Sequence, residues 1–120
     1  MTHPTTSFVE LTQGVSARLA TLRSGAPEVM KSFSGLGRAA MADGVLSAKT
    51  KELMALALGV AARCDPCIGY HVQALVKLGA SRQELDETLG VVVYMGGGPA
   101  LMYAANAIAA FDEMSGVVRA

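Results

Sequence analysis

Four side chains with reactive chemistry lie in one short run of the sequence, between Glu52 and His71. The run contains the chain's two cysteines, Cys64 and Cys67, with two residues between them. A C-x-x-C pair can close a disulfide across about one helical turn, and a nearby base can hold one sulfur as the thiolate, which is the nucleophilic form. The spacing E-x11-C-x2-C-x3-H therefore indicates thiol redox chemistry.

The residues around the cysteines predict a helix that brings Cys67 and His71 to one face. Asp65 suits the N-cap and Pro66 suits the first helical position, so Cys67 falls in the first turn. Free N–H groups and the helix dipole favour a thiolate there, and His71, four residues later, can take its proton. Cys64 lies at the helix mouth, close enough to bridge. Helix position and His71 favour Cys67 as the attacking sulfur, whereas exposure favours Cys64.

Glu52 and Tyr70 are candidate supporting residues of this site. Glu52 lies one helix earlier, and a short connection could fold it back against His71, where it would orient the imidazole and stabilise its protonated form. Alone, Glu52 could equally be a carboxylate that balances a helix dipole. Tyr70 could donate a hydrogen bond into the site or serve as an interfacial aromatic.

Zinc binding is the main rival to redox chemistry for this cluster. The two cysteines, His71 and Glu52 would supply four ligands. Structural zinc sites prefer more thiolates, and a second C-x-x-C is absent. Inert packing is the other alternative, because free cysteines are often small buried hydrophobes. We expect a redox pair, with no metal and no cofactor.

Capping residues and breaks predict a series of helices around one core. Capping-box patterns at Ser7-x-x-Glu10 and Ser81-x-x-Glu84 each open a helix, and Gly79 suits a left-handed C-terminal cap. The expected helices cover 8–25, 27–41, 48–62, 66–78 and 82–94, and a last one follows the break at 96–99 and ends near 114. The third is apolar almost all round, as a fully surrounded central helix would be. The predicted fold is an all-α bundle of five or six helices.

Length and composition restrict the architecture and the partners. The 120 residues predict a single domain, 1–120, and the 52% hydrophobic content against 17% charged suggests that other subunits cover part of the surface. Equal numbers of acidic and basic residues, ten each, argue against nucleic acid as a partner. Charges and glycines interrupt the apolar stretches, which argues against a membrane span. The N-terminus shows no secretory pattern, so the cytoplasm is the expected compartment.

The same residues resemble the carboxymuconolactone decarboxylase superfamily, and within it the AhpD-like alkylhydroperoxidase branch. The resemblance rests on Glu52, Cys64, Cys67 and His71 at that branch's spacing and extends through Gly96-Gly97-Gly98-Pro99-Ala100 and the Ala-rich closing helix. It implies an all-α bundle whose protomers assemble into homotrimers or homohexamers. It also implies that the two cysteines form the redox disulfide, while Glu52 and His71 move protons to the reacting sulfur.

One position departs from the AhpD pattern. AhpD has a histidine immediately before the second cysteine, whereas this chain has Pro66. The change removes one proton donor, which bears on the strength of peroxidase activity and on the choice of reductant.

Three functions are compatible with the sequence. The first is a thiol peroxidase or disulfide oxidoreductase in antioxidant defence, with a hydroperoxide or disulfide substrate and a thiol reductant. The second is a decarboxylase-like enzyme that acts on a small lactone acid through His71. The third is a non-enzymatic redox sensor. The cysteine pair favours the first, because the superfamily's decarboxylases do not need it.

Overall fold

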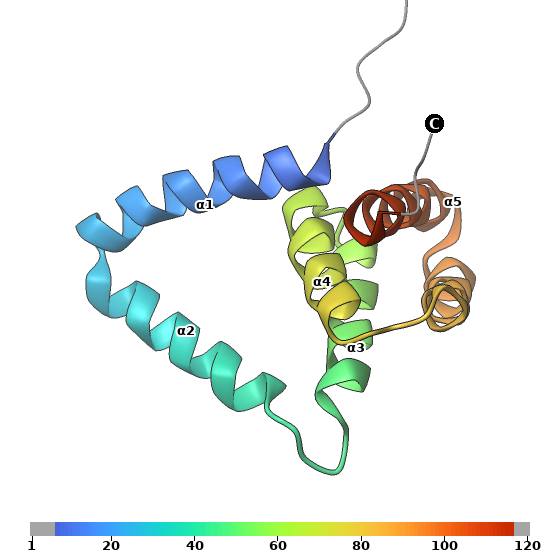
Figure 1. The fold of residues 1–120 in the computed structure, drawn as a ribbon, viewed down its shortest axis with the longest axis horizontal. Coiled ribbons are helices and arrows are strands. Elements are labelled where there is room, and N and C mark those ends of the chain that lie inside the picture. The colour runs from blue at the N-terminus through green and yellow to red at the C-terminus, as the bar shows by residue number, and fades with distance from the viewer. Residues whose placement is uncertain (1–6, 117–120) are drawn as a thin grey trace, which may run out of the picture.

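The chain is all-α, with helices packed around an apolar core (Figure 1). The computed structural model describes residues 7–116. The helices are α1 (Phe8–Gly25), α2 (Pro27–Met41), α3 (Ala48–Ala61), α4 (Asp65–Lys77) and α5 (Arg82–Ser115). These bounds agree closely with the expected ones. The N-terminal stretch used above to assign a compartment, and both ends of the predicted domain 1–120, fall outside the described residues.

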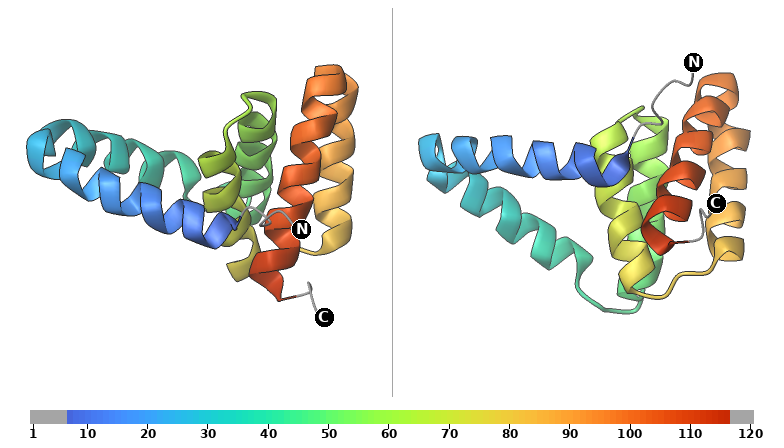
Figure 2. Two further views of the ribbon diagram at one scale, coloured as in Figure 1. Left: turned by 90° about the horizontal axis from the view of Figure 1, so that it is seen from above. Right: turned by 45° about the horizontal axis from the view of Figure 1, so that its top comes forward.

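Helix α5 consists of two helices joined at Gly97. Gly97 has φ 71° and ψ −156°, a backbone conformation that is essentially restricted to glycine. The two halves run in opposite directions side by side (Figure 2). Arg82–Ser115 is long and apolar enough to cross a membrane by length and composition alone, with a mean hydropathy of 1.3 in its most apolar window. Because the chain reverses at Gly97, these residues do not form one continuous span in this structure.

The core lies between α3, α4 and α5, with the start of α1 packed against it. Leu56, Ile68, Val72 and Leu75 are completely buried there. The other buried apolar residues are Phe8, Val60, Leu85, Leu89, Val92, Ala100, Ala104, Ala107, Ala110 and Phe111. The valines at 91–93, which alone would suggest a strand, are helical because the Ser81 capping box opens α5 upstream of them.

Two apolar surfaces stay open in the single chain. Helix α3 is not fully surrounded as predicted, because Met54 is 50% exposed and Leu58 is 70% exposed. Helices α1 and α2 project away from the α3–α5 body and meet at their far end (Figure 1). Helix α2 has no buried residue, and its Phe33 is 70% exposed. The apolar excess in the composition is therefore partly on the surface.

The start of α1 is held by a carboxylate from the opposite end of the chain. Ser7 caps α1 by accepting a hydrogen bond from the Glu10 N–H at 3.1 Å, which is one of the two bonds of the predicted capping box. The further carboxylate comes from Glu113 on α5, which accepts from the Ser7 hydroxyl and the Phe8 N–H at 2.7 Å each and from the Val9 N–H at 3.3 Å. Partial burial opposes ionisation of Glu113, but these three donors outweigh it and lower its pKa from the ordinary 4.5.

Replacing Glu113 with glutamine should lower the free energy of unfolding at neutral pH by about 1–2 kcal/mol, because α1 loses the anionic part of its cap. Since folding lowers the Glu113 pKa, its contribution is complete above pH 4.5 and is lost as the pH falls through the folded-state pKa. The difference between variant and wild type should therefore shrink in acid. Urea unfolding at several pH values measures it, with exposed Glu10→Gln as the control. A difference that stays constant with pH would contradict the assignment.

Candidate functional site

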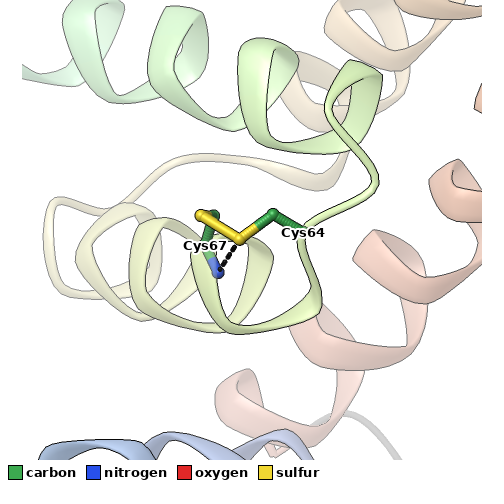
Figure 3. Close-up of a disulfide and its surroundings, with 2 residues drawn as sticks. All are labelled: Cys64 and Cys67. Carbon is green, nitrogen blue, oxygen red and sulfur yellow. Dashed lines mark hydrogen bonds between the residues drawn. A yellow bond between two sulfur atoms is a disulfide. The ribbon is translucent and has the colours of Figure 1, made fainter.

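The two cysteines form a disulfide at the N-terminal end of α4 (Figure 3). Their Cα atoms are 5.2 Å apart. Cys64 is the N-cap of α4, and its Sγ accepts a hydrogen bond from the Cys67 N–H at 3.2 Å. The prediction that Asp65 is the cap was wrong by one residue: Asp65 begins the helix and Pro66 follows it. The sulfur in the capping position, nearest the free N–H groups, is therefore that of Cys64.

Helix α3 packs directly against Cys67 at Gly59. A Cβ atom at Gly59 would lie 3.2 Å from the Cys67 Cβ, closer than most real contacts of that type. The absence of a side chain at Gly59 lets the α3 backbone lie against the disulfide. Both cysteines are half-buried. The disulfide is therefore supported from behind by α3 while part of it stays accessible.

A tight turn at Arg63 connects the end of α3 to Cys64. The Cys64 N–H bonds to the Gly59 carbonyl and the Arg63 N–H bonds to the Val60 carbonyl, each at 3.0 Å, which is a Schellman motif. Arg63 occupies its left-handed position with φ 59°. Helix α4 ends in the same motif, with Gly79 at the equivalent position as predicted, at φ 76°. A non-glycine residue is strained in this conformation, so the turn before Cys64 is a strained one.

Replacing Arg63 with glycine should relieve this strain and raise the free energy of unfolding by about 0.5–1 kcal/mol. The reverse change at the matching turn, Gly79→Arg, should lower it by about 1 kcal/mol. Urea unfolding of the oxidised proteins measures both. If Arg63→Gly instead lowers the free energy of unfolding, the Arg63 side chain stabilises the fold by more than its left-handed conformation destabilises it.

Glu52 and His71 form a direct pair across the α3–α4 interface. The distance from His71 Nδ1 to Glu52 Oε1 is 2.7 Å. Because an ionised carboxylate can only accept, Nδ1–H donates, and Nε2 is left to take or give a proton. The Glu52 side chain is 16% exposed and that of His71 is 32% exposed, so the imidazole is the more accessible partner. The fold therefore makes the predicted approach of Glu52 to His71.

Tyr70 is engaged by α1. Its hydroxyl donates to the Thr12 carbonyl at 2.9 Å and also bonds to the Ser16 hydroxyl. Because its one proton goes to Thr12, Ser16 donates to it. Tyr70 therefore joins α4 to α1, and we assign it no part in moving protons.

Asn106 is a residue of the site that the sequence reasoning missed. Its Nδ2 donates to the Asp65 carboxylate at 2.9 Å, which ties the second half of α5 to the turn that carries the cysteines. A single amide within an apolar, Ala-rich helix was the available signal, but its partner lies 41 residues away in sequence. Within residues 7–116, no group of three or more histidine, cysteine, aspartate or glutamate side chains could hold a metal ion.

Comparisons with known proteins cover the helices that carry this site. The model of the carboxymuconolactone decarboxylase family matches residues 27–110, from the start of α2 into the last part of α5. The chain belongs to this family. The membership predicted from the cysteine run is thereby confirmed. The match includes the disulfide, the Glu52–His71 pair and Asn106.

Solved structures of other carboxymuconolactone decarboxylase family proteins share the fold. A family protein from Legionella pneumophila is 56% identical, with a TM-score of 0.89 over 90% of this chain and 96% of that one. A second, from Thermotoga maritima, is 33% identical, with a TM-score of 0.78 over 92% of this chain and 91% of that one. The Thermotoga protein is described as a candidate for a role in antioxidative response.

Curated relatives of the chain are named without a function. An uncharacterized protein of Cupriavidus necator is 39% identical over 84% of this chain and 89% of its own length. Uncharacterized protein 4 in the cox locus of Paracoccus denitrificans is 34% identical over 80% of this chain and 86% of its own length. Family membership thus gives the fold and a class that includes enzymes, and the activity must be argued from the site.

Proposed function

We propose that this protein is a thiol-dependent peroxidase or disulfide oxidoreductase of the AhpD-like type. The observation that carries the proposal is the combination of a Cys64–Cys67 disulfide at a helix N-terminus with the Glu52–His71 pair at 2.7 Å. The disulfide is one end state of a dithiol cycle. A carboxylate–imidazole pair is the usual device for moving the proton that such a cycle releases and takes up.

In the proposed cycle, the reduced protein attacks a hydroperoxide. The thiolate of Cys64 bonds to the terminal oxygen, the O–O bond breaks, and the leaving alkoxide takes a proton to become the alcohol. Cys64 is then a sulfenic acid. The Cys67 thiol condenses with it, which forms the disulfide and releases water. A thiol reductant then returns the disulfide to two thiols.

Each protein group has one task in this cycle. The N-cap position of Cys64 and its contact with the Cys67 N–H favour the thiolate. His71 takes the thiol proton through Nε2 and returns a proton to the leaving alkoxide, and Glu52 keeps the imidazole oriented. Pro66, at the position where AhpD has a histidine, offers no proton, so His71 carries this task alone.

Hydroperoxide consumption by the reduced protein with dithiothreitol as electron donor tests the proposal. We expect wild-type protein to consume cumene hydroperoxide or a small disulfide, and the variant with serine at both 64 and 67 to be inactive. If the double variant still turns over a carboxylated lactone, a decarboxylase function replaces the proposed one. If wild type consumes neither substrate class, the redox enzyme proposal fails.

We further propose that the protein assembles as a homotrimer or homohexamer. The support is a large apolar area that the single chain leaves open, on α2, the outer side of α3 and both halves of α5. Its residues are Val29, Phe33, Leu36, Met54, Leu58, Val91, Tyr94, Met95, Leu101 and Met102. Large exposed apolar side chains gathered on a few helices are typical of faces that other subunits cover. The proposed compartment is the cytoplasm, where a reducing thiol pool is available.

Light scattering coupled to size exclusion measures the assembly. Phe33→Asp places a charge on the exposed α2 face without disturbing a buried position, so it should shift the protein toward smaller species. Lys31→Glu, on the same helix, is the matched control and should leave the mass unchanged. A wild-type mass equal to one chain would remove the proposal.

A further inference from the structure

The carboxylate between the two cysteines is held in place by another helix. Asp65 is the first residue of α4, directly after the N-cap Cys64. Asn106, on the second half of α5, donates from Nδ2 to Asp65 Oδ1 at 2.9 Å, and both residues are half-buried. A carboxylate in a first helical turn needs no such partner, because the dipole already favours it. The bond fixes where this negative charge lies.

Asp65 and a reduced Cys64 present like charges to the same helix end. In the disulfide, Cys64 is neutral and the carboxylate alone occupies the N-terminal field of α4. When the disulfide is reduced, a Cys64 thiolate would share that field with Asp65, and the two anions repel each other. Asp65 therefore lowers the thiolate population of the dithiol and favours the disulfide.

Other charged groups do not offset the repulsion between the Asp65 carboxylate and a Cys64 thiolate. Arg63 precedes Cys64 and has the opposite sign, but it is exposed and well solvated. Glu52 on α3 and His71 on α4 are bound to each other. From α5, the group that meets this turn is the neutral amide of Asn106. Asp65 is thus a carboxylate that a hydrogen bond holds in the turn of the cysteines.

We propose that Asp65 sets the reactivity of the Cys64–Cys67 pair, and that Asn106 is the positioning residue that holds Asp65 in this role. The proposal rests on the redox function proposed above and adds how the pair is tuned. It predicts a disulfide that is harder to reduce than the same C-x-x-C turn without the carboxylate. The expected reductant is therefore a strongly reducing dithiol.

Three variants separate charge from structure. Asp65→Asn removes the charge and keeps an oxygen to accept from Asn106. Asn106→Ala removes the bond and keeps the charge. Asp86→Asn removes an exposed carboxylate elsewhere, on the first half of α5, as the control. Each is made in wild type, for equilibration with glutathione and glutathione disulfide, and in the Cys67→Ser background, where iodoacetamide alkylation reports on Cys64 alone as a function of pH.

We expect Asp65→Asn to move the pH midpoint of Cys64 alkylation down by about half a unit to one unit. It should also shift the pair toward the dithiol by about threefold in glutathione buffer. Asn106→Ala should cause smaller changes in the same direction, because the freed carboxylate can turn toward solvent, and Asp86→Asn should cause none.

The proposal is overturned if the pH profile of Cys64 alkylation in Asp65→Asn superimposes on that of the Cys67→Ser protein, or if its midpoint moves to higher pH. Asp65 then has a structural role. An Asn106→Ala profile without a shift, alongside a shifted Asp65→Asn profile, overturns the positioning role. Neither readout uses a hydroperoxide, so both results stand whether or not the protein proves to be a peroxidase.

Discussion

Replacing Cys64 with serine is expected to lower the rate of hydroperoxide consumption by about 10³-fold or more, because it removes the sulfur that we propose attacks the hydroperoxide. Cys64 is the N-cap of α4, and its Sγ already accepts a hydrogen bond from the Cys67 N–H. That donor and the helix dipole stabilise negative charge on this sulfur. Stopped-flow measurement of hydroperoxide loss after mixing with pre-reduced protein gives the rate.

The matched variant is Cys67→Ser, which we expect to react once with hydroperoxide and then stop. Its Cys64 sulfenic acid has no thiol to condense with, and dimedone should trap it. The chain has two cysteines, so the double variant carries no thiol and supplies the background rate. Trapping in Cys64→Ser instead of Cys67→Ser would reverse the order of attack.

Replacing His71 with glutamine should slow the reaction with hydroperoxide by about 10²-fold, which is typical for loss of a positioned acid–base group. Glutamine keeps a hydrogen-bonding group toward Glu52 but cannot exchange a proton at neutral pH. Glu52→Gln should have a smaller effect, about tenfold, because the imidazole is still present and only its orientation is weakened. Single-turnover rates at saturating hydroperoxide measure both.

The control for this pair is oxidation of the dithiol by diamide, which needs no proton delivery to a leaving alkoxide. Its rate should fall less than the hydroperoxide rate in His71→Gln, because both reactions need the Cys64 proton removed and only the hydroperoxide reaction needs a proton on the leaving alkoxide. The exposed Glu87→Gln should match wild type in both reactions. Equal slowing with diamide and hydroperoxide would contradict the delivery of a proton from His71 to the leaving alkoxide.

The helix boundaries were predictable because the signals that set them are local. Ser47 and Ser81 cap the helices that follow them, and Gly79 ends α4 in the left-handed conformation. Each of these acts within about one helical turn of its position in sequence. The same rules failed at Cys64, because cap preferences favour Asp65 and do not anticipate a cysteine sulfur as the acceptor. They also gave no reason to expect Arg63 in the left-handed position.

Contacts between distant segments were predictable only where a short connection required them. The Glu52–His71 pair was expected conditionally, since a three-residue turn folds α4 back on α3. Asn106 with Asp65, and Glu113 with the start of α1, join residues 41 and more than 100 positions apart. Any of several polar residues could have filled these places. The folded structure, and not the local pattern, selects the partner.

The exposure of these apolar faces could not be predicted for a related reason. After Glu52 the third helix is apolar almost all round, and sequence alone does not say whether the same chain or another copy covers each side. In the single chain, Leu56 and Val60 face the core while Leu58 faces outward. Hydrophobic pattern therefore predicts burial, but it does not identify the partner.

The most direct test of the redox assignment is the stoichiometry of one turnover. Fully reduced protein is mixed with one equivalent of cumene hydroperoxide, and both the intact mass and the cumyl alcohol are measured. We expect the mass to fall by two hydrogen atoms as Cys64 and Cys67 join, with one cumyl alcohol formed per chain. An unchanged mass with the hydroperoxide intact would contradict a catalytic role for the pair, as would oxygen gained at methionine with both thiols still free.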